Sequence, residues 1–213
     1  MSILNPSIEK PTARIAKLPI DGRGYPVPWF VPSIDGNPEF RAFDAQKWID
    51  AVRYSLCWVC GEQLGSYKAF VLGPMCGITR TTSEPPCHLE CAEWSARNCP
   101  FLSQPKAVRR EDEFTDKCDS AGIQIKRNPG VTLIWVTKQF RVFNDPQGKP
   151  LITVGNPTKI KWYHQGRPAT REDVEHSIDT GCPLLLEQAK KDGPAAVAEL
   201  NRMRKAFEIY YPE

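Results

Sequence analysis

The chain has 213 residues, with 28 basic and 25 acidic side chains and a formal net charge of +3. Hydrophobic residues make up 41% of it, enough for a core, so the composition excludes wholesale disorder. The charge is weaker than the basic excess of dedicated nucleic-acid-binding proteins. The sequence shows no apolar run long enough to span a membrane and no signal peptide. We therefore expect a cytoplasmic protein whose eight cysteines stay reduced.

The first forty residues are rich in proline and show no regular periodicity. We expect residues 1–20 to form a flexible arm, mobile or draped over the surface. Residues 22–40 place four prolines in an aromatic run. Because proline fixes φ and lacks an N–H group, neither a helix nor a central strand fits there. We predict an extended segment that packs Tyr25, Trp29 and Phe30 on the core, with an exposed aromatic binding surface as the alternative.

The next stretch has the pattern of an amphipathic helix followed by a tight turn with two cysteines. Apolar residues recur on one helical face through residues 44–56, and Asp44 is placed to cap its N-terminus. The sequence CWVCG follows at 57–61. Residues 68–78 then predict two short strands broken by a Gly-Pro pair. Residues 86–98 predict a short helix, with proline tolerated in its first turn.

A polar stretch separates two halves of different character. Residues 103–128 have mixed charge and no usable period, which predicts a linker or long loop between lobes 21–102 and 129–213. Four β-prone runs follow, separated by turn sequences, and the first is VTLIWVT at 131–137. We predict that these four runs form a small antiparallel meander.

Boundary residues predict three helices after this meander. Thr170 and Asp173 resemble a capping box, with Asp in place of the usual Glu. Gly181 is placed to end the first helix, Pro183 to begin the second and Pro194 to begin the last. The predicted fold class is therefore α+β.

Four potential zinc ligands fall in two pairs. Cys57 and Cys60 lie on a tight turn, and the flexible Gly61 follows them. His88 and Cys91 fall in the first turn of a predicted helix, where residues three apart share a face. Zinc prefers four tetrahedral nitrogen and sulfur donors, and three cysteines with one histidine are a common structural set. Knuckle, hairpin and ligand-bearing helix resemble a treble-clef zinc finger, so we predict Zn²⁺ at these four residues.

Other cysteines leave alternatives open. Cys87 adjoins His88 and could replace it as a ligand, whereas Cys76 lies in the predicted hairpin. A second zinc site built from Cys76, Cys87 and Cys99 would lack an obvious fourth donor. A CxxC sequence alone also fits a redox pair or buried thiols. A site with four protein ligands has no open position for water, so the predicted zinc would support folding and not catalysis.

Several stretches carry a family resemblance: GYPVPWFV, CWVCG, FVLGPMCGITRTTSEPPCHLECAEWSARNCPFL and RNPGVTLIWVT. Together they resemble a family of uncharacterised actinobacterial and actinobacteriophage proteins, from about residue 20 to residue 190. The resemblance implies a bacterial or phage setting. It also implies that His88 and Cys91 are the ligands, since the position of Cys87 often holds another small residue in that family. No activity comes with it.

For function, we expect a non-enzymatic, zinc-stabilised interaction protein that binds a host or phage macromolecule, with a protein slightly favoured. Gly-rich phosphate loops and the nucleophile elbow are absent from the sequence. An HNH-like nuclease shares the treble clef, but it needs a catalytic histidine, and His88 is predicted to bind zinc. An enzyme assembled from His164, Arg167 and His176 is a further alternative.

A nucleic-acid-binding protein is the main alternative. The basic residues that would contact phosphates are Arg141, Lys159, Lys161, Arg202 and Lys205. An ordinary solvated face is the competing interpretation of the same residues.

Overall fold

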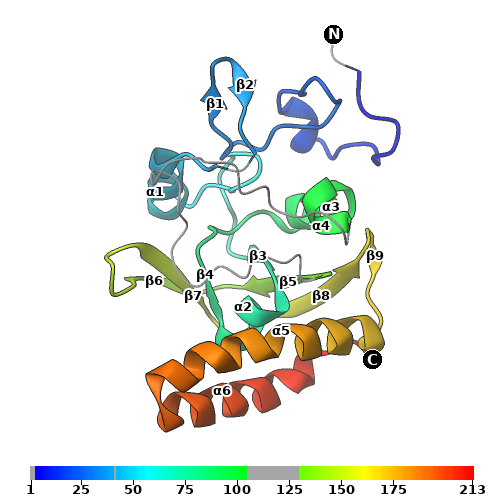
Figure 1. The fold of residues 1–213 in the computed structure, drawn as a ribbon. Coiled ribbons are helices and arrows are strands. Elements are labelled where there is room, and N and C mark those ends of the chain that lie inside the picture. Colours follow the sequence, from blue (N-terminus) through cyan, green and yellow to red (C-terminus); the bar gives the residue numbers. More distant parts are fainter. Residues whose placement is uncertain (1–2, 41, 105–129) are drawn as a thin grey trace.

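The computed structural model describes residues 3–40, 42–104 and 130–213, which form an α+β fold. Two antiparallel sheets lie in the middle, and helices cover the larger one from both sides (Figure 1). Helices α2, α5 and α6 lie against one side of the larger sheet, and α3 lies against the other. None of the helices in the described ranges has the length and apolar character needed to cross a membrane.

The larger sheet has the strand order β3-β5-β8-β9, with all neighbours antiparallel. Its strands are β3 (Lys68–Leu72), β5 (Val131–Thr137), β8 (Lys159–His164) and β9 (Arg167–Pro168). Every residue of β5 is buried, because helices cover both faces of this central strand. This double coverage explains why its sequence is a nearly continuous apolar run.

The smaller sheet has the order β4-β7-β6 and is also antiparallel. Its strands are β4 (Thr81–Thr82), β6 (Phe140–Asn144) and β7 (Pro150–Val154). All four predicted β-runs are strands, but the predicted single meander is wrong. β5 pairs with β3 and β8, whereas β6 and β7 pair with each other, because strands from the first half of the chain complete both sheets.

The halves on either side of residues 105–129 are therefore joined through backbone pairing. β3 and β4 precede that segment, and each pairs with a strand that follows it. Nearly all of the predicted 103–128 linker lies outside the described residues. The division into lobes 21–102 and 129–213 stays a prediction.

Helix α1 (Ala45–Arg53) begins where the sequence predicted it. The side chain of Asp44 accepts hydrogen bonds from the N–H groups of Gln46 and Lys47, which confirms the N-cap. The helix ends three residues before the predicted position 56. Trp48 is buried on its inner face, and its Nε1 donates to the Ser83 carbonyl at 2.7 Å.

The Gly-Pro pair after β3 begins a helix and does not break a hairpin. Helix α2 spans Pro74–Thr79, with Pro74 in its first turn, where the missing N–H group has no helical partner. The second strand predicted for residues 68–78 is therefore wrong. A Cβ on Gly77 would lie 2.7 Å from side-chain atoms of Leu133 and Phe207, so glycine lets α2 sit tightly on the core.

The short helix expected near residues 86–98 is α3 (Leu89–Asn98), followed by the single turn α4 (Pro100–Ser103). His88 is the N-cap of α3. Cys87, just before it, pairs with Ala69 of β3 in one antiparallel bridge. This bridge stands where the sequence predicted a regular hairpin.

The predicted break at Gly181 and Pro183 is wrong, because helix α5 is continuous from Arg171 to Asp192. Its capping box between Thr170 and Asp173 is confirmed. Gly181 faces Met75 of α2, where a Cβ would lie 3.1 Å from the Met75 Cε atom. Packing on α2 and on helix α6 (Pro194–Phe207) thus outweighs the helix-breaking effect of proline.

The remaining elements are short. They are the 3₁₀ helices η1 (Ile15–Lys17) and η2 (Glu208–Tyr210) and the hairpin strands β1 (Ser33–Ile34) and β2 (Asn37–Pro38). The sequence analysis missed the hairpin. Trp29 and Phe30 pack against the core as predicted, and the Phe30 ring stacks on Trp58 with centroids 4.7 Å apart.

Candidate metal centre

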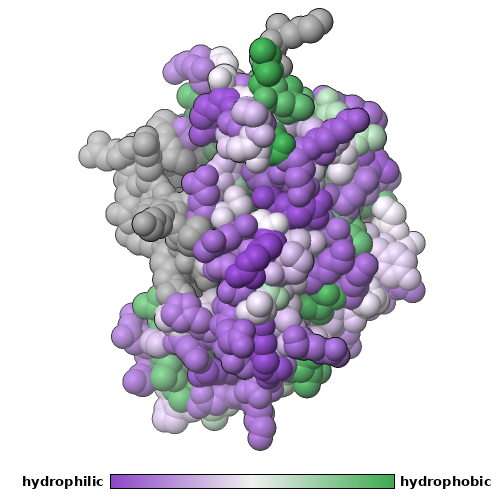
Figure 2. Space-filling model, turned by 90° about the vertical axis from the view of Figure 1, so that its right-hand side faces the viewer, coloured by the Kyte–Doolittle hydropathy of each residue, from purple (hydrophilic) through white to green (hydrophobic). Residues whose placement is uncertain are grey.

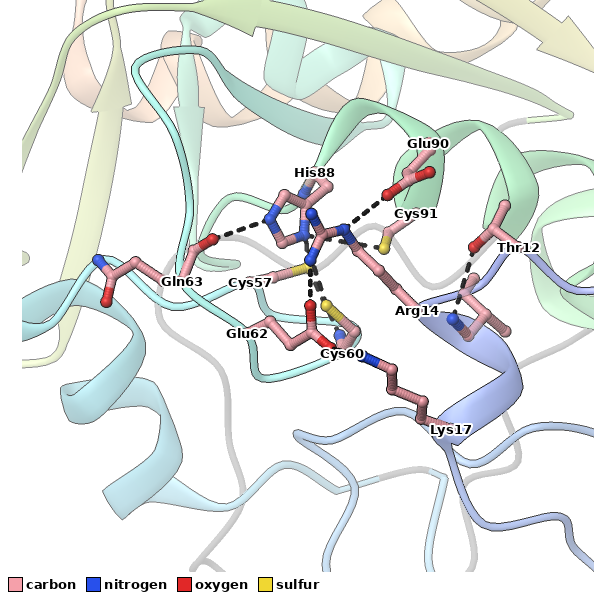
Figure 3. A network of polar contacts seen from close by, with 11 residues as sticks. Thr12, Arg14, Lys17, Cys57, Cys60, Glu62, Gln63, His88, Glu90 and Cys91 are labelled. Carbon is pink, nitrogen blue, oxygen red and sulfur yellow. Dashed lines mark hydrogen bonds and ion pairs between the residues drawn. The ribbon is translucent and has the colours of Figure 1, made fainter.

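The four sequence-predicted ligands lie together (Figure 3). One donor atom from each of Cys57, Cys60, His88 and Cys91 lies within 4.8 Å of every other. Two come from the turn after α1, and two come from the start of α3. This is a three-cysteine, one-histidine cluster that could hold a metal ion.

The first ligand pair sits on a turn whose backbone is tightly constrained. The Gly61 N–H donates to the Cys57 carbonyl at 2.8 Å, and the Cys60 N–H points at the Cys57 Sγ at 3.4 Å. Gly61 has a φ of +74°, and a Cβ there would lie 2.8 Å from the Trp29 ring. Glycine is required both by the left-handed backbone and by the close aromatic ring.

The second pair is placed by the start of α3. The His88 N–H group also points at the Cys57 Sγ, at 3.4 Å. The His88 Nδ1 atom lies 3.4 Å from the Cys60 Sγ and 4.0 Å from the Cys91 Sγ. Tetrahedral zinc with normal bond lengths separates sulfur and nitrogen donors by about 3.6 Å. The observed separations bracket that value.

The other ring nitrogen of His88 has a separate partner. Its Nε2 atom lies 3.0 Å from the Gln63 main-chain oxygen. A carbonyl oxygen only accepts, so the Nε2 atom carries the proton. With the proton on Nε2, the Nδ1 atom can present its lone pair towards the Cys60 and Cys91 sulfurs. Metal-bound histidines usually hold their second nitrogen in this way.

Hydrogen bonds among the cysteines shift their thiol pKa values in opposite directions. Hydrogen bonds from the side chains of Cys60 and Cys91 lower the pKa of Cys57 to about 3. The hydrogen bond to Cys57 raises the pKa of Cys91, because that thiol keeps its proton as the donor. Cys57 is therefore favoured as a thiolate, which is the form that binds a metal.

The rival cysteines lie outside the cluster. Cys87 is buried and its Sγ points at the Ala69 carbonyl oxygen at 3.3 Å, and burial raises its pKa. Burial also raises the pKa of Cys76, to about 11, and that of Cys99. Within the part of the chain that the structure describes, no second group of metal-binding side chains occurs. Cys118 lies outside that part.

The alternative enzymatic residues are only partly together. His164 and Arg167 both lie beside Asp173, at 3.7 Å and 2.7 Å respectively. The Nδ1 of His164 also contacts the Gly130 carbonyl oxygen at 2.7 Å. His176 is exposed on α5. Arg167 and the Thr170 N–H lower the pKa of Asp173 to about 2, so this carboxylate organises the turn between β9 and α5.

The basic residues weighed for phosphate contact do not share one sheet. Arg141 is on β6 of the smaller sheet, whereas Lys159 and Lys161 are on β8 of the larger one. Lys161 forms an ion pair with Glu93 of α3. These three residues therefore do not lie on one sheet. On α6, Arg202 pairs with Glu199, and Lys205 is exposed.

Sequence reasoning missed the charged residues beside the cluster. Arg14 forms ion pairs with Glu62 and Glu90, and Lys17 forms one with Glu62 at 2.7 Å (Figure 3). Arg14 and Glu90 are 76 positions apart in the sequence, so no local pattern indicated this contact. Only the closeness of both glutamates to ligand cysteines in the sequence hints at their position.

No protein-family model, no curated protein and no solved structure matches the chain significantly. The resemblance to actinobacterial and actinobacteriophage proteins therefore stays a prediction. What is known of the site comes from its own geometry.

Proposed function

We propose that Cys57, Cys60, His88 and Cys91 bind one Zn²⁺ ion whose role is structural. The observation that carries this proposal is the convergence of all four donor atoms within 4.8 Å, with the histidine lone pair directed at the sulfurs. Three thiolates and one imidazole suit zinc, because softer sulfur ligands select it over magnesium, calcium or manganese. The ion would join the turn after α1 to the start of α3.

The proposed architecture is a modified treble clef. The cysteine knuckle and the helix with its two ligands are those of that motif. In place of a regular hairpin, β3 and Cys87 contribute one antiparallel bridge, and α2 and β4 are inserted between them. β3 and the inserted β4 connect the zinc region to both sheets, because β3 pairs with β5 and β4 pairs with β7.

For the whole protein we propose a non-enzymatic, zinc-stabilised interaction role with a host or phage macromolecule. Four protein ligands fill a tetrahedral site, so no position is left for a reactive water. Both ring nitrogens of His88 have partners, Gln63 and the sulfur cluster, which leaves no free nitrogen for the general base of an HNH-like nuclease.

We favour a protein partner over nucleic acid. Two of the five weighed basic residues, Lys161 and Arg202, are paired with glutamates, which lowers the charge free for phosphates. The face in Figure 2 is mostly hydrophilic, with apolar residues in small separate groups. Exposed apolar residues of the described chain include Ile49, Val142 and Phe143.

Elemental analysis of the purified protein tests the zinc site. We expect about one zinc ion per chain in the wild type and in His176→Ala, whose imidazole is exposed and away from the cluster. The His88→Ala variant should lose the ion. A full zinc complement in His88→Ala would contradict the ligand set. A gel shift across a salt series tests the nucleic-acid alternative, which predicts binding that weakens steeply as salt increases.

A further inference from the structure

The N-terminal segment lies against the candidate metal centre. Residues 3–20, here called the N-terminal strap, include the 3₁₀ turn η1. Ile15 in this turn is 1% exposed and packs in the same apolar cluster as Cys57 and Cys91. Ile8, before this turn in the sequence, and Leu18, after it, also pack against that cluster. The strap is therefore anchored beside the ligands themselves.

Arg14 connects the two elements that the zinc ion would join. Its guanidinium contacts Glu62, two residues after Cys60, and Glu90, one residue before Cys91. The distance from Arg14 Nε to the Glu90 Oε1 atom is 2.6 Å. Figure 3 shows the side chain reaching from η1 to both carboxylates, which flank the cysteine cluster. Lys17 holds Glu62 from the same turn.

This double contact depends on the spacing of the two carboxylates. Glu62 moves with the cysteine turn, and Glu90 moves with the first turn of α3. A bound cation fixes those two elements relative to each other. Without it, hydrogen bonds join these two elements near the cluster, such as the one from the Trp58 N–H to the Pro86 carbonyl at 3.0 Å. Arg14 then loses the fixed spacing that lets it bridge both partners.

Other polar contacts of the strap lie away from the cysteine turn. Asn5 hydrogen-bonds with the main chain of Arg23 and Gly24. Glu9 pairs with Arg97 at 2.9 Å, at the far end of α3. These contacts hold the first residues of the strap whether or not the cysteine turn is fixed. Coupling to the metal is thus confined to the turn that contains Arg14, Ile15 and Lys17.

We propose that this turn is a metal-linked clasp: zinc binding and the docking of η1 stabilise each other, and loss of zinc releases Ile15 and uncovers the apolar surface beside α3. The inference rests on the zinc site proposed above. Linkage makes the coupling reciprocal. A substitution that weakens docking of the strap must therefore also weaken zinc binding by the protein. The clasp therefore strengthens zinc binding, and we expect the difference to appear mainly as slower release of the ion.

The first test is the rate at which zinc passes to an excess of a colour-forming chelator. In Arg14→Met, which keeps the aliphatic stem, transfer should be faster by about threefold to tenfold. Glu90→Gln removes one of the two anchors without changing the strap, and we expect a smaller acceleration. Arg204→Met is the matched control, because its side chain is 42% exposed against 36% for Arg14 and pairs with Asp179 at 2.7 Å on the helices of the opposite side. Its transfer rate should equal that of the wild type.

The second test is limited trypsin cleavage of the wild-type chain. Zinc removal should accelerate cleavage after Lys17 by about tenfold or more, while cleavage after Arg202 in α6 stays slow. Equal cleavage after Lys17 with and without zinc would overturn the clasp. So would a parallel rise at Arg202, because it would indicate global unfolding, or equal transfer rates in Arg14→Met and Arg204→Met. If elemental analysis finds no zinc in the wild type, the proposed metal site is wrong. If zinc is present but any of these contrary results is found, only the clasp is wrong.

Discussion

The Nε2 atom of His88 lies 3.0 Å from the main-chain oxygen of Gln63, and this contact selects the Nδ1 atom as the one that faces the cysteines. The Nδ1 position is closer to the Cβ atom than Nε2 is. A shorter side chain with a donor atom near Cβ therefore suits the site. Cysteine has such a side chain, and zinc accepts four thiolates as readily as three with an imidazole.

We predict that His88→Cys retains zinc, whereas His88→Ala does not. The measurement is the zinc-to-protein ratio after dialysis against a weak chelator. The His88→Cys variant loses the hydrogen bond to Gln63, and loss of such an outer contact typically weakens metal affinity about tenfold or more. Loss of zinc from both variants to the same extent would show that the donor is not near Cβ, which contradicts ligation through Nδ1.

Gly61→Ala should destabilise the protein and weaken zinc binding together. Alanine at a φ of +74° costs about 1–2 kcal/mol, and its Cβ would lie 2.8 Å from the Trp29 ring, which adds overpacking. We expect the free energy of unfolding to fall by about 2–4 kcal/mol in chemical denaturation. Gly65→Ala is the control, since a Cβ there meets nothing within 4 Å. Equal stabilities of the two variants would contradict the proposed constraint on the turn.

The convergence of the four candidate ligands could be predicted from the sequence because the relevant spacings are local. Cys57 with Cys60, and His88 with Cys91, are each three positions apart, and the backbone of one turn brings each pair together. The α+β class and the N-cap at Asp44 were predictable for the same reason, since each depends on a short stretch of chain.

Long-range pairing was not predictable in this way. β5 carries the same apolar run whether it pairs with β3 or with β6, so its sequence does not select a neighbour. The Gly-Pro pair at 73–74 fits a turn and also a helix start, and packing against Leu133 and Phe207 decides between them. The contact between Arg14 and Glu90 joins residues 76 positions apart, so it depends on the tertiary fold and not on a local pattern.

Asp173 should make stability depend on pH in the acidic range. Arg167 and the Thr170 N–H lower its pKa from 3.8 to about 2, so the folded state holds its proton less tightly than the unfolded state. The stabilising contribution is complete above about pH 4 and is lost as pH falls towards 2. After allowance for solvent screening we expect it to be about 1 kcal/mol.

Urea unfolding of the wild type and Asp173→Asn, from about pH 6 to about pH 2.5, measures this contribution. The stability gap between them should narrow below about pH 4. Loss of zinc in acid affects both proteins and cancels in the difference. Asp179→Asn, which removes a more exposed carboxylate paired with Arg204, should show a smaller gap. A gap for Asp173→Asn that stays constant with pH would contradict the lowered pKa.

Pro183→Ala should stabilise the protein, in contrast to the substitutions above. Pro183 is exposed inside the continuous helix α5, where it has no N–H group to donate to the carbonyl of Asp179. Alanine restores that donor and removes the ring clash, which together cost about 3 kcal/mol in an unstrained helix. Because α5 already accommodates the proline, we expect a gain of about 1–2 kcal/mol, seen as a higher midpoint of thermal unfolding. Glu187→Ala, at another exposed position of α5, should change stability by less than about 0.5 kcal/mol. A lower midpoint for Pro183→Ala would mean that the fit of α5 against α2 and α6 depends on the geometry that the proline imposes.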